Sequence, residues 1–332
     1  MQKKFSIIGA GAWGTAMGLH LALKDNKVLL WAFEKHIKEM IESQRQNYFL
    51  QGYTLESNID ATNEIEEALE FSDYVFWAVP VQYIAGIVEK IDSSRYSGKC
   101  FINLSKGLEI SRKRFPLEIL RENFGENSEY IALAGPSFAS EFAAGKPTIL
   151  VAASDKLNTA KDIQDIIQQR AVRVYTSDDA YGIQLAGAFK NIYAIAAGIA
   201  DGMELGGNAR AALITRALVE LTRLATQLNA SPETIAGAAG IGDLILTCTS
   251  EKSRNYSFGL QIGKGSSPDE IIARTDKAVE GYYSTKAAFE FSKVKMVELP
   301  IANILYEVLY ENLSPGKALK ALLERSPKPE WY

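Results

Sequence analysis

Short apolar runs alternate with helical stretches through the first half of the chain. The pattern predicts strands at residues 5–8, 27–31, 74–79, 100–104, 130–134, 149–153 and 172–175. Helical periodicity lies between several of these runs, for example at residues 63–70 and 81–91. Nearly continuous apolar strands that alternate with helices are typical of a parallel sheet buried on both faces. We therefore expect an α/β fold with a doubly wound, mostly parallel sheet.

The pattern changes after about residue 177. Residues 178–199 are helical and rich in alanine and glycine, and residues 208–228 repeat apolar side chains at steps of three and four. We expect two domains, a sheet domain over residues 1–177 and an all-helical domain over residues 178–332. The opposite, polar face of the second helix carries Arg216, Glu220, Arg223 and Gln227. Three further helices are expected at residues 281–295, 300–311 and 315–324.

The composition of the chain argues against several classes of function. The 332 residues include 36 Lys and Arg against 40 Asp and Glu, a net charge of −4, which argues against a general nucleic-acid binder. The two histidines, His20 and His36, lie near the amino terminus, so no later histidine serves as a base or a zinc ligand. Cys100 and Cys248 are too far apart for a metal-ligand motif, and we expect no metal site.

Neither a targeting segment nor a membrane-spanning segment is expected. The apolar stretch near the amino terminus is short and is interrupted by glycines. The most apolar later run, residues 192–200, is about half of the roughly 20 residues that a bilayer span needs. Because two cysteines in a chain of this size suit a reducing compartment, we expect a cytoplasmic protein without membrane insertion.

A glycine-rich turn follows the first predicted strand and opens a helical stretch at residues 15–23. Its sequence is Gly9-Ala10-Gly11-Ala12-Trp13-Gly14. In this context a GxGxxG motif is the dinucleotide-binding fingerprint of a Rossmann-type fold. Gly9 would allow the tight turn, Gly11 would let the backbone approach the pyrophosphate, and Gly14 would permit close packing of helix and strand. The phosphates would lie at the helix N-terminus. An ordinary glycine-rich turn is the alternative.

The residues after the second strand favour NAD over NADP. Glu34 lies 20 residues after Gly14, where an acidic side chain binds the ribose hydroxyls, and no arginine occurs in this stretch. Phe33 could stack on the adenine. Lys35 is near, so NADP remains possible, and a solvated Glu34 is the alternative.

Two further turns follow predicted strands. Ser105-Lys106-Gly107 follows the strand at 100–104, and Gly135-Pro136-Ser137-Phe138 precedes a helical stretch at 139–144. Ligands of open α/β sheets bind beyond the carboxyl ends of strands, so Lys106 could face a nicotinamide and an anionic substrate. A surface lysine and ordinary helix capping are the alternatives.

Lys190 interrupts an otherwise apolar helix that continues to residue 200 without another charge. A buried charge costs free energy unless it is paired, and burial would lower the pKa of the lysine towards the range useful for proton transfer. Gly187, one turn earlier, would let a ligand approach. A lysine whose ammonium reaches solvent is the alternative.

The last group of candidates surrounds one aspartate. Gly240-Ile241-Gly242-Asp243 is followed by Thr247 and by Ser253-Arg254-Asn255. Small residues around Asp243 suggest a tight buried turn in which the carboxylate pairs with a lysine. Arg254 offers planar donors suited to a phosphate. A turn followed by a solvated helix start is the alternative.

Taken together, these motifs resemble the NAD(P)-dependent glycerol-3-phosphate dehydrogenase family along essentially the whole chain. The matching segments are GAGAWGTA at 9–16, SKGL at 105–108, AGPSFASE at 134–141, AFKN at 188–191, GNARAALITR at 207–216, GIGDLILTC at 240–248, SRN at 253–255 and AVEG at 278–281. The stretch at residues 31–34 departs from the usual bacterial pattern, which carries a basic residue near Phe33, and this departure agrees with an NAD preference.

The resemblance implies roles for individual residues. Lys190 is similar to the catalytic proton carrier, Lys106 to the lysine that contacts substrate and nicotinamide, and Asp243 to the carboxylate of the same site. The remaining residues implied to contact the substrate are Gly135, Ser137, Asn191, Thr247, Ser253, Arg254 and Asn255. Those implied to contact the cofactor are Gly9, Gly11, Ala12, Trp13, Gly14, Phe33, Pro80, Tyr83, Lys106, Ala139, Arg254, Val279 and Glu280.

The implied reaction is reversible hydride transfer between sn-glycerol 3-phosphate and dihydroxyacetone phosphate. The family would supply glycerol 3-phosphate for phospholipids or serve redox shuttling, and a homodimer is expected by analogy. Two other classes stay open. One is a different dehydrogenase with a similar fold that acts on another hydroxy acid or on an imine, and the other is a non-catalytic module that senses a nucleotide.

Overall fold

The computed structural model describes residues 2–275, 278–327 and 329–330. The chain groups into two compact units. The sheet unit comprises Met1–Ser105 and Phe115–Ala180, and the helical unit comprises Lys106–Arg114 and Tyr181–Tyr332. Each unit is built around its own hydrophobic core, and each is described separately below.

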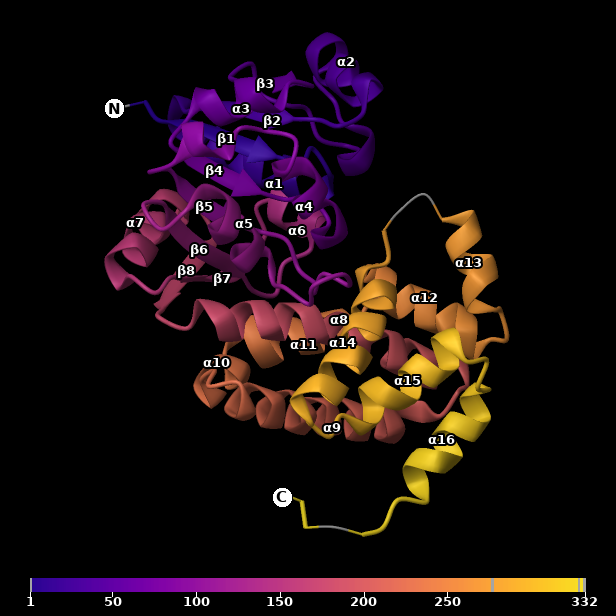
Figure 1. Cartoon of the computed structure of the whole chain (residues 1–332). Coiled ribbons are helices and arrows are strands. Elements are labelled where there is room, and N and C mark those ends of the chain that lie inside the picture. The colour runs from indigo at the N-terminus through magenta and orange to yellow at the C-terminus, as the bar shows by residue number, and fades with distance from the viewer. Residues whose placement is uncertain (1, 276–277, 328, 331–332) are drawn as a thin grey trace. The chain divides into compact units, whose positions relative to one another are not determined.

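An eight-stranded sheet forms the centre of the sheet unit, in the order β3-β2-β1-β4-β5-β6-β7-β8 (Figure 1). Neighbouring strands pair in parallel except for β6 and β7, which are antiparallel. The first six strands have the order typical of dinucleotide-binding folds. The strands are β1 (Lys4–Ile8), β2 (Lys27–Trp31), β3 (Ile59–Thr62), β4 (Tyr74–Trp77), β5 (Cys100–Asn103), β6 (Glu129–Ala134), β7 (Thr148–Ala153) and β8 (Val172–Ser177).

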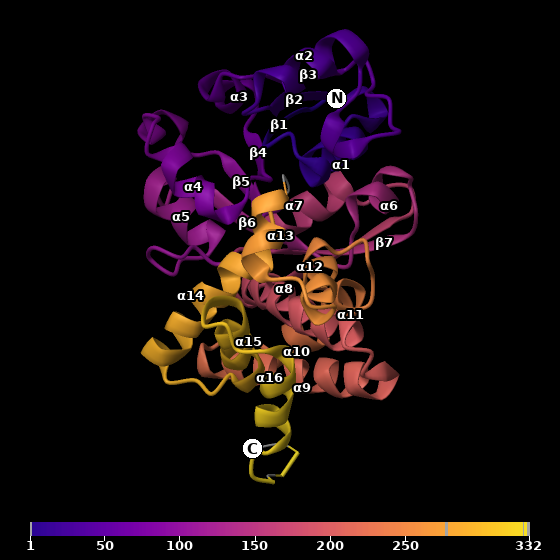
Figure 2. The same ribbon diagram turned by 90° about the vertical axis from the view of Figure 1, so that its right-hand side faces the viewer.

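Helices cover both faces of this sheet. Helix α1 contacts α6 and α7, whereas α4 packs against α5 on the opposite side of the strands (Figure 2). The helices are α1 (Ala12–Leu21), α2 (Lys35–Gln44), α3 (Ile65–Phe71), α4 (Val81–Val88), α5 (Pro116–Phe124), α6 (Ala139–Ala143) and α7 (Leu157–Ile167), with short 3-10 turns η1 (Leu23–Asp25), η2 (Tyr48–Leu50) and η3 (Ser93–Tyr96). Because both faces are covered, strand residues such as Phe5, Phe76 and Ile102 are wholly buried.

All regular elements of the second unit are helices among the residues that the structure describes, and its segment Lys106–Arg114 is a loop. Its elements are α8 (Ala180–Gly202), α9 (Gly206–Gln227), α10 (Pro232–Ala236), the π-helical turn η4 (Ala238–Gly242), α11 (Asp243–Cys248), α12 (Arg254–Gly263), α13 (Pro268–Arg274), α14 (Glu280–Lys295), α15 (Pro300–Tyr310) and α16 (Pro315–Leu323). The predicted fold class, a mostly parallel doubly wound sheet followed by an all-helical part, is confirmed.

Helix α8 is the core of the helical unit. It is the one helix of the described residues that is long and apolar enough to cross a membrane, and its most apolar window is completely buried in the protein. A helix that is apolar on every side is typical of such a central position. Side chains or backbone atoms from α9, α11, α12 and α14 all contact it. A charged residue on α8 is therefore enclosed by protein.

Two sequence interpretations need correction. Strand β3 was not predicted, because its four residues include the exposed Asp60 and lack a continuous apolar run. The face of α9 that carries Glu220 and Arg223 is not simply a solvated face. Glu220 is 3% exposed and accepts from the backbone N–H of Ile301 at 2.7 Å, so it satisfies the N-terminus of α15.

Candidate active site

Several of the predicted cofactor and substrate contacts lie at one edge of the sheet. Gly9 follows β1, Phe33 follows β2, Pro80 follows β4 and Gly135 follows β6. These four strands run parallel, and β5 lies between β4 and β6 and is parallel to both. Their carboxyl ends therefore meet at the edge where open α/β sheets bind ligands.

The glycines of the β1–α1 turn have different surroundings. Gly9 has a φ of +116°, and a Cβ there would lie 2.8 Å from the Ala78 carbonyl oxygen. A Cβ on Gly14 would lie 2.0 Å from the Gly9 oxygen. Gly11, in contrast, has no atom within 4 Å of the position that its Cβ would take. Two glycines are therefore required by packing, whereas the third leaves a space beside the backbone for a ligand.

The N-terminus of α1 adjoins this space. Gly11 is the N-cap, so no side chain caps the helix, and the first turn contains no acidic residue. The first backbone N–H groups of a helix, here those beginning at Ala12 and Trp13, lack partners within the helix. Together with the helix dipole they favour an anion. The turn therefore fits the pyrophosphate of a dinucleotide.

The next positions along this edge are aromatic and exposed. The side chain of Phe33 is 76% exposed and that of Tyr83 is 63% exposed. Glu34 is half-buried at the N-cap of α2, where its side chain caps no backbone N–H. An exposed Phe33 beside a carboxylate fits an adenosine, because the ring offers a face for stacking and Glu34 offers acceptors for hydroxyl groups.

The β6–α6 turn contains the other predicted contacts of the sheet unit. A Cβ at Gly135 would lie 2.4 Å from the Ile149 oxygen, so β7 requires a glycine at this position. The hydroxyl of Ser137 donates to the Gly135 oxygen at 3.1 Å, and Ala139 begins the five-residue helix α6. The turn is thus shaped mainly by its own packing.

A lysine–aspartate cluster lies in the helical unit. One carboxylate oxygen of Asp243, Oδ1, accepts from Lys190 Nζ at 2.7 Å, and the other, Oδ2, accepts from Lys106 Nζ at 2.6 Å. Lys190 Nζ also lies 2.8 Å from the Thr247 hydroxyl. Lys190 is 6% exposed and Asp243 is 1% exposed. The buried ammonium of Lys190 is therefore paired and does not reach solvent.

Burial sets the protonation behaviour of this cluster. Desolvation lowers the pKa of Lys190 from 10.5 to about 8, with the charge of Lys106 acting in the same direction, while Asp243 opposes the shift. Desolvation alone would raise the pKa of Asp243, but the two ammonium groups outweigh it and hold that pKa below its ordinary value. Lys190 can thus exchange a proton near neutral pH beside a carboxylate that stays ionised.

Local backbone structure explains how Asp243 reaches Lys190. The π-helical turn η4 ends at Gly242, immediately before Asp243, and such turns are frequent at functional sites. A Cβ at Gly240 would lie 2.1 Å from the Ile235 oxygen, so this turn depends on glycine. Asp243 then begins α11, and Thr247 follows one turn later on the same face.

The start of α12 lies beside the middle of α8. The Asn255 amide donates to the Asn191 side-chain oxygen at 3.0 Å and accepts from the Gly281 N–H at 2.8 Å. Ser253 caps α12, since its hydroxyl accepts from the backbone N–H of Tyr256. Arg254 is exposed, and its guanidinium makes no hydrogen bond to another described residue. The two asparagines therefore fix the place from which Arg254 extends.

Glu280 is a predicted cofactor residue with a buried oxygen that lacks a hydrogen bond to a described residue. Its Oε2 is buried and has no hydrogen-bond partner among the described residues. Burial raises the pKa of this carboxyl to about 7, although the nearby Arg254 acts to lower it. Val279, the preceding residue, is 5% exposed. A buried acceptor without a partner is costly unless a ligand N–H fills it.

The histidines and cysteines have structural surroundings. The buried ring of His20 contacts the Ile167 oxygen at 2.7 Å, and His36 is exposed on α2. Both cysteines are free, and burial raises the pKa of each thiol to about 12. No group of three possible metal ligands occurs among the residues that the structure describes. Neither histidine and neither cysteine is therefore part of the lysine–aspartate cluster.

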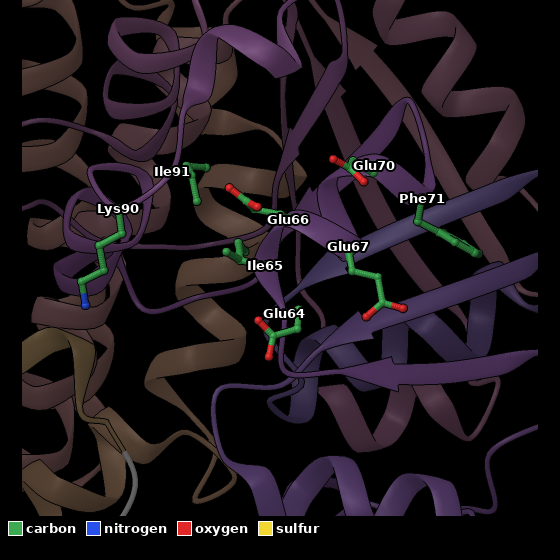
Figure 3. Close-up of a pocket in the computed structure, with 8 residues that line it drawn as sticks. All are labelled: Glu64, Ile65, Glu66, Glu67, Glu70, Phe71, Lys90 and Ile91. Carbon is green, nitrogen blue, oxygen red and sulfur yellow. The ribbon is translucent and has the colours of Figure 1, made fainter.

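An acidic hollow lies elsewhere on the sheet unit (Figure 3). It is lined by Glu64, Glu66, Glu67 and Glu70, together with Ile65, Phe71, Lys90 and Ile91. Four carboxylates around one ammonium would repel a phosphate group. We therefore assign no dinucleotide site to this hollow.

The structure brings together Lys106, Lys190, Asp243 and Thr247, which the sequence placed in separate motifs. It also reveals two buried groups that sequence reasoning missed. Arg114 pairs with Glu109, and the Tyr193 hydroxyl lies 3.4 Å from Glu220. Each pair joins residues whose proximity depends on the folded chain, so no local motif indicated them.

A glycine turn suited to pyrophosphate and a buried lysine with a lowered pKa define a nucleotide-dependent dehydrogenase. Comparison with known families gives the particular one. The model of the NAD-dependent glycerol-3-phosphate dehydrogenase N-terminus matches residues 4–160, and that of the C-terminus matches residues 179–320. The chain belongs to the NAD-dependent glycerol-3-phosphate dehydrogenase family. It is an oxidoreductase with the activity of a glycerol-3-phosphate dehydrogenase that uses NAD(P)+.

Individual relatives agree along their full length. A glycerol-3-phosphate dehydrogenase (NAD(P)+) from Chlorobium phaeobacteroides is 40% identical over 332 residues, covering 99% of this chain and 100% of the relative. One from Staphylococcus carnosus is 38% identical, covering 98% of this chain and 99% of the relative. The crystal structure of glycerol-3-phosphate dehydrogenase from Coxiella burnetii superposes with a TM-score of 0.93 at 35% identity, covering 98% and 99% of the two chains.

Proposed function

We propose that Lys190 carries the proton in the interconversion of sn-glycerol 3-phosphate and dihydroxyacetone phosphate. When bound, NAD(P)H would supply the hydride in the reducing direction, and NAD(P)+ would accept it in the oxidising direction. In the reducing direction protonated Lys190 Nζ would give its proton to the C2 carbonyl oxygen as that oxygen becomes an alkoxide. In the oxidising direction neutral Lys190 Nζ would accept the proton of the C2 hydroxyl. The observation that supports this role best is the buried Lys190–Asp243 pair at 2.7 Å, in which the pKa of Lys190 is lowered to about 8.

Asp243 and Lys106 would complete this proton site. Asp243 would keep Lys190 oriented and preserve part of its basicity, because an opposite charge resists the effect of desolvation. Lys106, on the other oxygen of the same carboxylate, would place positive charge where the substrate oxygen becomes negative. The Thr247 hydroxyl would accept a second N–H of Lys190 and leave the third N–H for the substrate oxygen.

The phosphate group of the substrate would bind at Arg254. Its planar guanidinium offers paired donors, and the Asn191–Asn255 hydrogen bond at 3.0 Å sets the start of its helix. We also propose Ser253, Gly135 and Ser137 as substrate contacts. Binding energy from a phosphate that does not react would position C2 for hydride transfer.

The cofactor would bind along the carboxyl edge of the sheet. Gly11, Ala12 and Trp13 would hold the pyrophosphate, and Gly9 and Gly14 would shape the turn that holds it. The buried Oε2 of Glu280 would accept from a carboxamide N–H of the nicotinamide. The remaining proposed cofactor contacts are Phe33, Pro80, Tyr83, Lys106, Ala139, Arg254 and Val279.

We propose NAD as the preferred cofactor, with NADP as the weaker one. Glu34 would accept from the ribose hydroxyls, whereas a 2′-phosphate would meet its negative charge. The test compares kcat/KM for NADH and NADPH in the native enzyme and in Glu34→Gln. We expect the native enzyme to favour NADH and Glu34→Gln to narrow that preference. A native preference for NADPH would contradict the assignment.

The proton carrier is tested by Lys190→Ala in the oxidation of NADH by dihydroxyacetone phosphate. Removing a general acid costs about 10²- to 10⁴-fold in kcat, and NADH binding measured by fluorescence should persist. Lys264→Ala, which removes an exposed lysine of the same unit, is the matched control and should keep native turnover. Near-native turnover in Lys190→Ala would refute the role.

Three broader assignments belong with this function. We propose that residues 1–177 act as the dinucleotide-binding domain and residues 178–332 as the catalytic domain, which the separate matches to residues 4–160 and 179–320 support. We also propose a cytoplasmic homodimer that acts on one small phosphorylated substrate. Sedimentation of the purified enzyme at twice the mass of one chain would support the dimer, and a monomer would contradict it.

A further inference from the structure

The segment Lys106–Arg114 groups with the helical unit although the residues on both sides of it do not. Ser105, immediately before it, is anchored in the sheet unit, where its hydroxyl donates to the Val79 oxygen at 2.6 Å. Phe115, immediately after it, also belongs to the sheet unit. Lys106 is thus placed by contacts to the helical unit, although its strand neighbours belong to the sheet.

A buried ion pair joins two residues of the segment Lys106–Arg114. Arg114 donates from Nε to Glu109 Oε2 at 2.8 Å and from its second amino nitrogen to Oε1 at 2.9 Å. The backbone N–H of Glu109 donates to the Arg114 oxygen at 3.0 Å. The exposed fractions are 4% for Glu109 and 8% for Arg114. This two-point geometry fixes Glu109, three residues after Lys106, relative to the end of the segment at Arg114.

The Glu109 carboxyl is ionised when it pairs with Arg114. Burial would raise the pKa of Glu109, but hydrogen bonds and charge from Arg114 outweigh it, assisted by hydrogen bonds from Ser111 and Arg112, and the pKa is lowered. Glu109 is therefore an ion throughout the neutral range. A buried ion pair is weak support for stability as such, because its desolvation offsets its attraction.

The other end of the loop leads to the lysine–aspartate cluster. The stem of Lys106 lies against Gly187 of α8, with its Cγ 3.4 Å from the position of a Cβ on Gly187. Its ammonium reaches Asp243 at 2.6 Å. Lys113 contacts Glu290 of α14 at 2.6 Å, but this second pair is about one-third exposed on both sides. The buried Glu109–Arg114 pair is thus the more rigid constraint on the loop.

We propose that the Glu109–Arg114 ion pair is a positioning device for the reaction, which holds the loop so that Lys106 meets Asp243 and the reacting oxygen. The inference rests on the proposed role of Lys106. Glu109 and Arg114 themselves touch neither substrate nor cofactor in this account. Their effect on turnover passes through the position of the Lys106 ammonium, where an error of about 1 Å can cost about 10²-fold in rate.

The experiment is a double-mutant cycle on kcat for dihydroxyacetone phosphate with saturating NADH. It compares Glu109→Gln, Lys106→Ala and the double variant Lys106→Ala/Glu109→Gln. We expect Glu109→Gln to lower kcat by about 10- to 100-fold in the native background and by less than about 2-fold once Lys106 is absent. Because Lys106 is also a proposed cofactor contact, the dissociation constant for NADH is measured for each variant by fluorescence, and every kcat is taken at saturating NADH. Lys113→Ala, which breaks the exposed pair of the same loop, is the matched control and should keep native kcat.

A second variant distinguishes an effect on the position of Lys106 from an effect on the stability of the fold. Glu109→Met/Arg114→Met removes both charges together and leaves neither unpaired, so it should fold even if Glu109→Gln does not. We expect a native melting temperature within a few degrees and the same loss of kcat. Native kcat in this variant would overturn the inference.

The outcomes distinguish the inference from the function on which it rests. A loss from Glu109→Gln that persists in full without Lys106 would overturn the positioning role and leave the proposed proton site intact. Native kcat in Lys106→Ala would overturn the role of Lys106 and this inference with it. A loss of kcat from Glu109→Gln at saturating NADH that disappears once Lys106 is replaced by alanine supports both.

Discussion

The candidate binding sites of the two units differ in the groups that they offer to a ligand. The sheet unit offers backbone and empty space, as at Gly11, where no atom lies within 4 Å of the position of a Cβ. The helical unit offers charge, with Asp243 1% exposed between two ammonium groups. The first arrangement costs little before a ligand arrives. The second holds three charged groups together at a cost in desolvation.

The difference follows from the task of each unit. A pyrophosphate keeps its charge throughout a reaction, so fixed N–H groups suffice to bind it. A substrate oxygen that gains and loses a proton needs a group whose pKa lies near the working pH. Burial lowers the pKa of Lys190 to about 8, and the adjacent Asp243 limits the fall. Substitution at Gly11 should therefore affect binding alone, whereas substitutions in the lysine–aspartate cluster should affect chemistry and folding together.

The largest effect is expected from Asp243→Asn. The change leaves Lys106 and Lys190 close together with no anion between them, which should lower the free energy of unfolding by about 3–5 kcal/mol and reduce kcat by about 10²-fold or more. Urea denaturation and the NADH oxidation assay measure the two quantities. Glu324→Gln, which breaks the exposed pair with Lys320, is the control and should change stability by less than about 1 kcal/mol. An unchanged free energy of unfolding in Asp243→Asn would contradict the claim that Asp243 neutralises two buried ammonium groups.

Arg254→Ala should come next and should separate binding from proton transfer within the helical unit. Loss of charged hydrogen bonds to a phosphate costs about 1.5–3 kcal/mol, or roughly 10- to 100-fold in KM for dihydroxyacetone phosphate. Because Arg254 is exposed and not part of the lysine–aspartate cluster, the melting temperature should stay native. Steady-state kinetics over a wide substrate range checks this. A native KM would contradict the phosphate assignment.

The smallest effects are expected in the sheet unit, where two glycines give a matched pair. Gly14→Ala places a Cβ 2.0 Å from the Gly9 oxygen, so it should destabilise the unit by about 1–3 kcal/mol. Gly11→Ala meets no protein atom and has an N-cap backbone at φ −71°, so stability should be native while the dissociation constant for NADH rises by about 10-fold. Thermal unfolding and fluorescence titration check the pair. Equal NADH binding in Gly11→Ala and the native enzyme would place the pyrophosphate elsewhere.

The sheet unit was the easier to predict from sequence. Seven of its strands follow from apolar runs, since strands buried on both faces are apolar at nearly every position. Strand β3 lacks such a run because it has few apolar residues and one exposed position, Asp60. The glycine turn is local in sequence, so its context after β1 was sufficient to predict its shape.

The helical unit could be predicted only in part. Periodicity indicated the long helices, but α10, α11 and α13 have five to seven residues and are too short to show it. The unusual position of Lys190 was visible as a charge in an apolar helix. Its pairing with Asp243, 53 residues away, depends on the π-helical turn before α11. The Glu109–Arg114 pair had no local signal at all.

The central claim is that burial makes Lys190 the proton carrier, and its pH dependence tests this most directly. With its pKa lowered to about 8 from 10.5, Lys190 loses its proton as pH rises through about 8. The acid form is needed to reduce dihydroxyacetone phosphate, so kcat/KM in that direction should fall across this range. The base form is needed to oxidise glycerol 3-phosphate, so kcat/KM in that direction should rise.

The measurement is therefore kcat/KM in both directions between about pH 6.5 and 9.5, in the native enzyme and in Lys190→Ala. The account predicts two opposite transitions centred near pH 8 in the native enzyme and their loss in Lys190→Ala. Transitions that persist in Lys190→Ala, or profiles that move in the same sense in both directions, would contradict it.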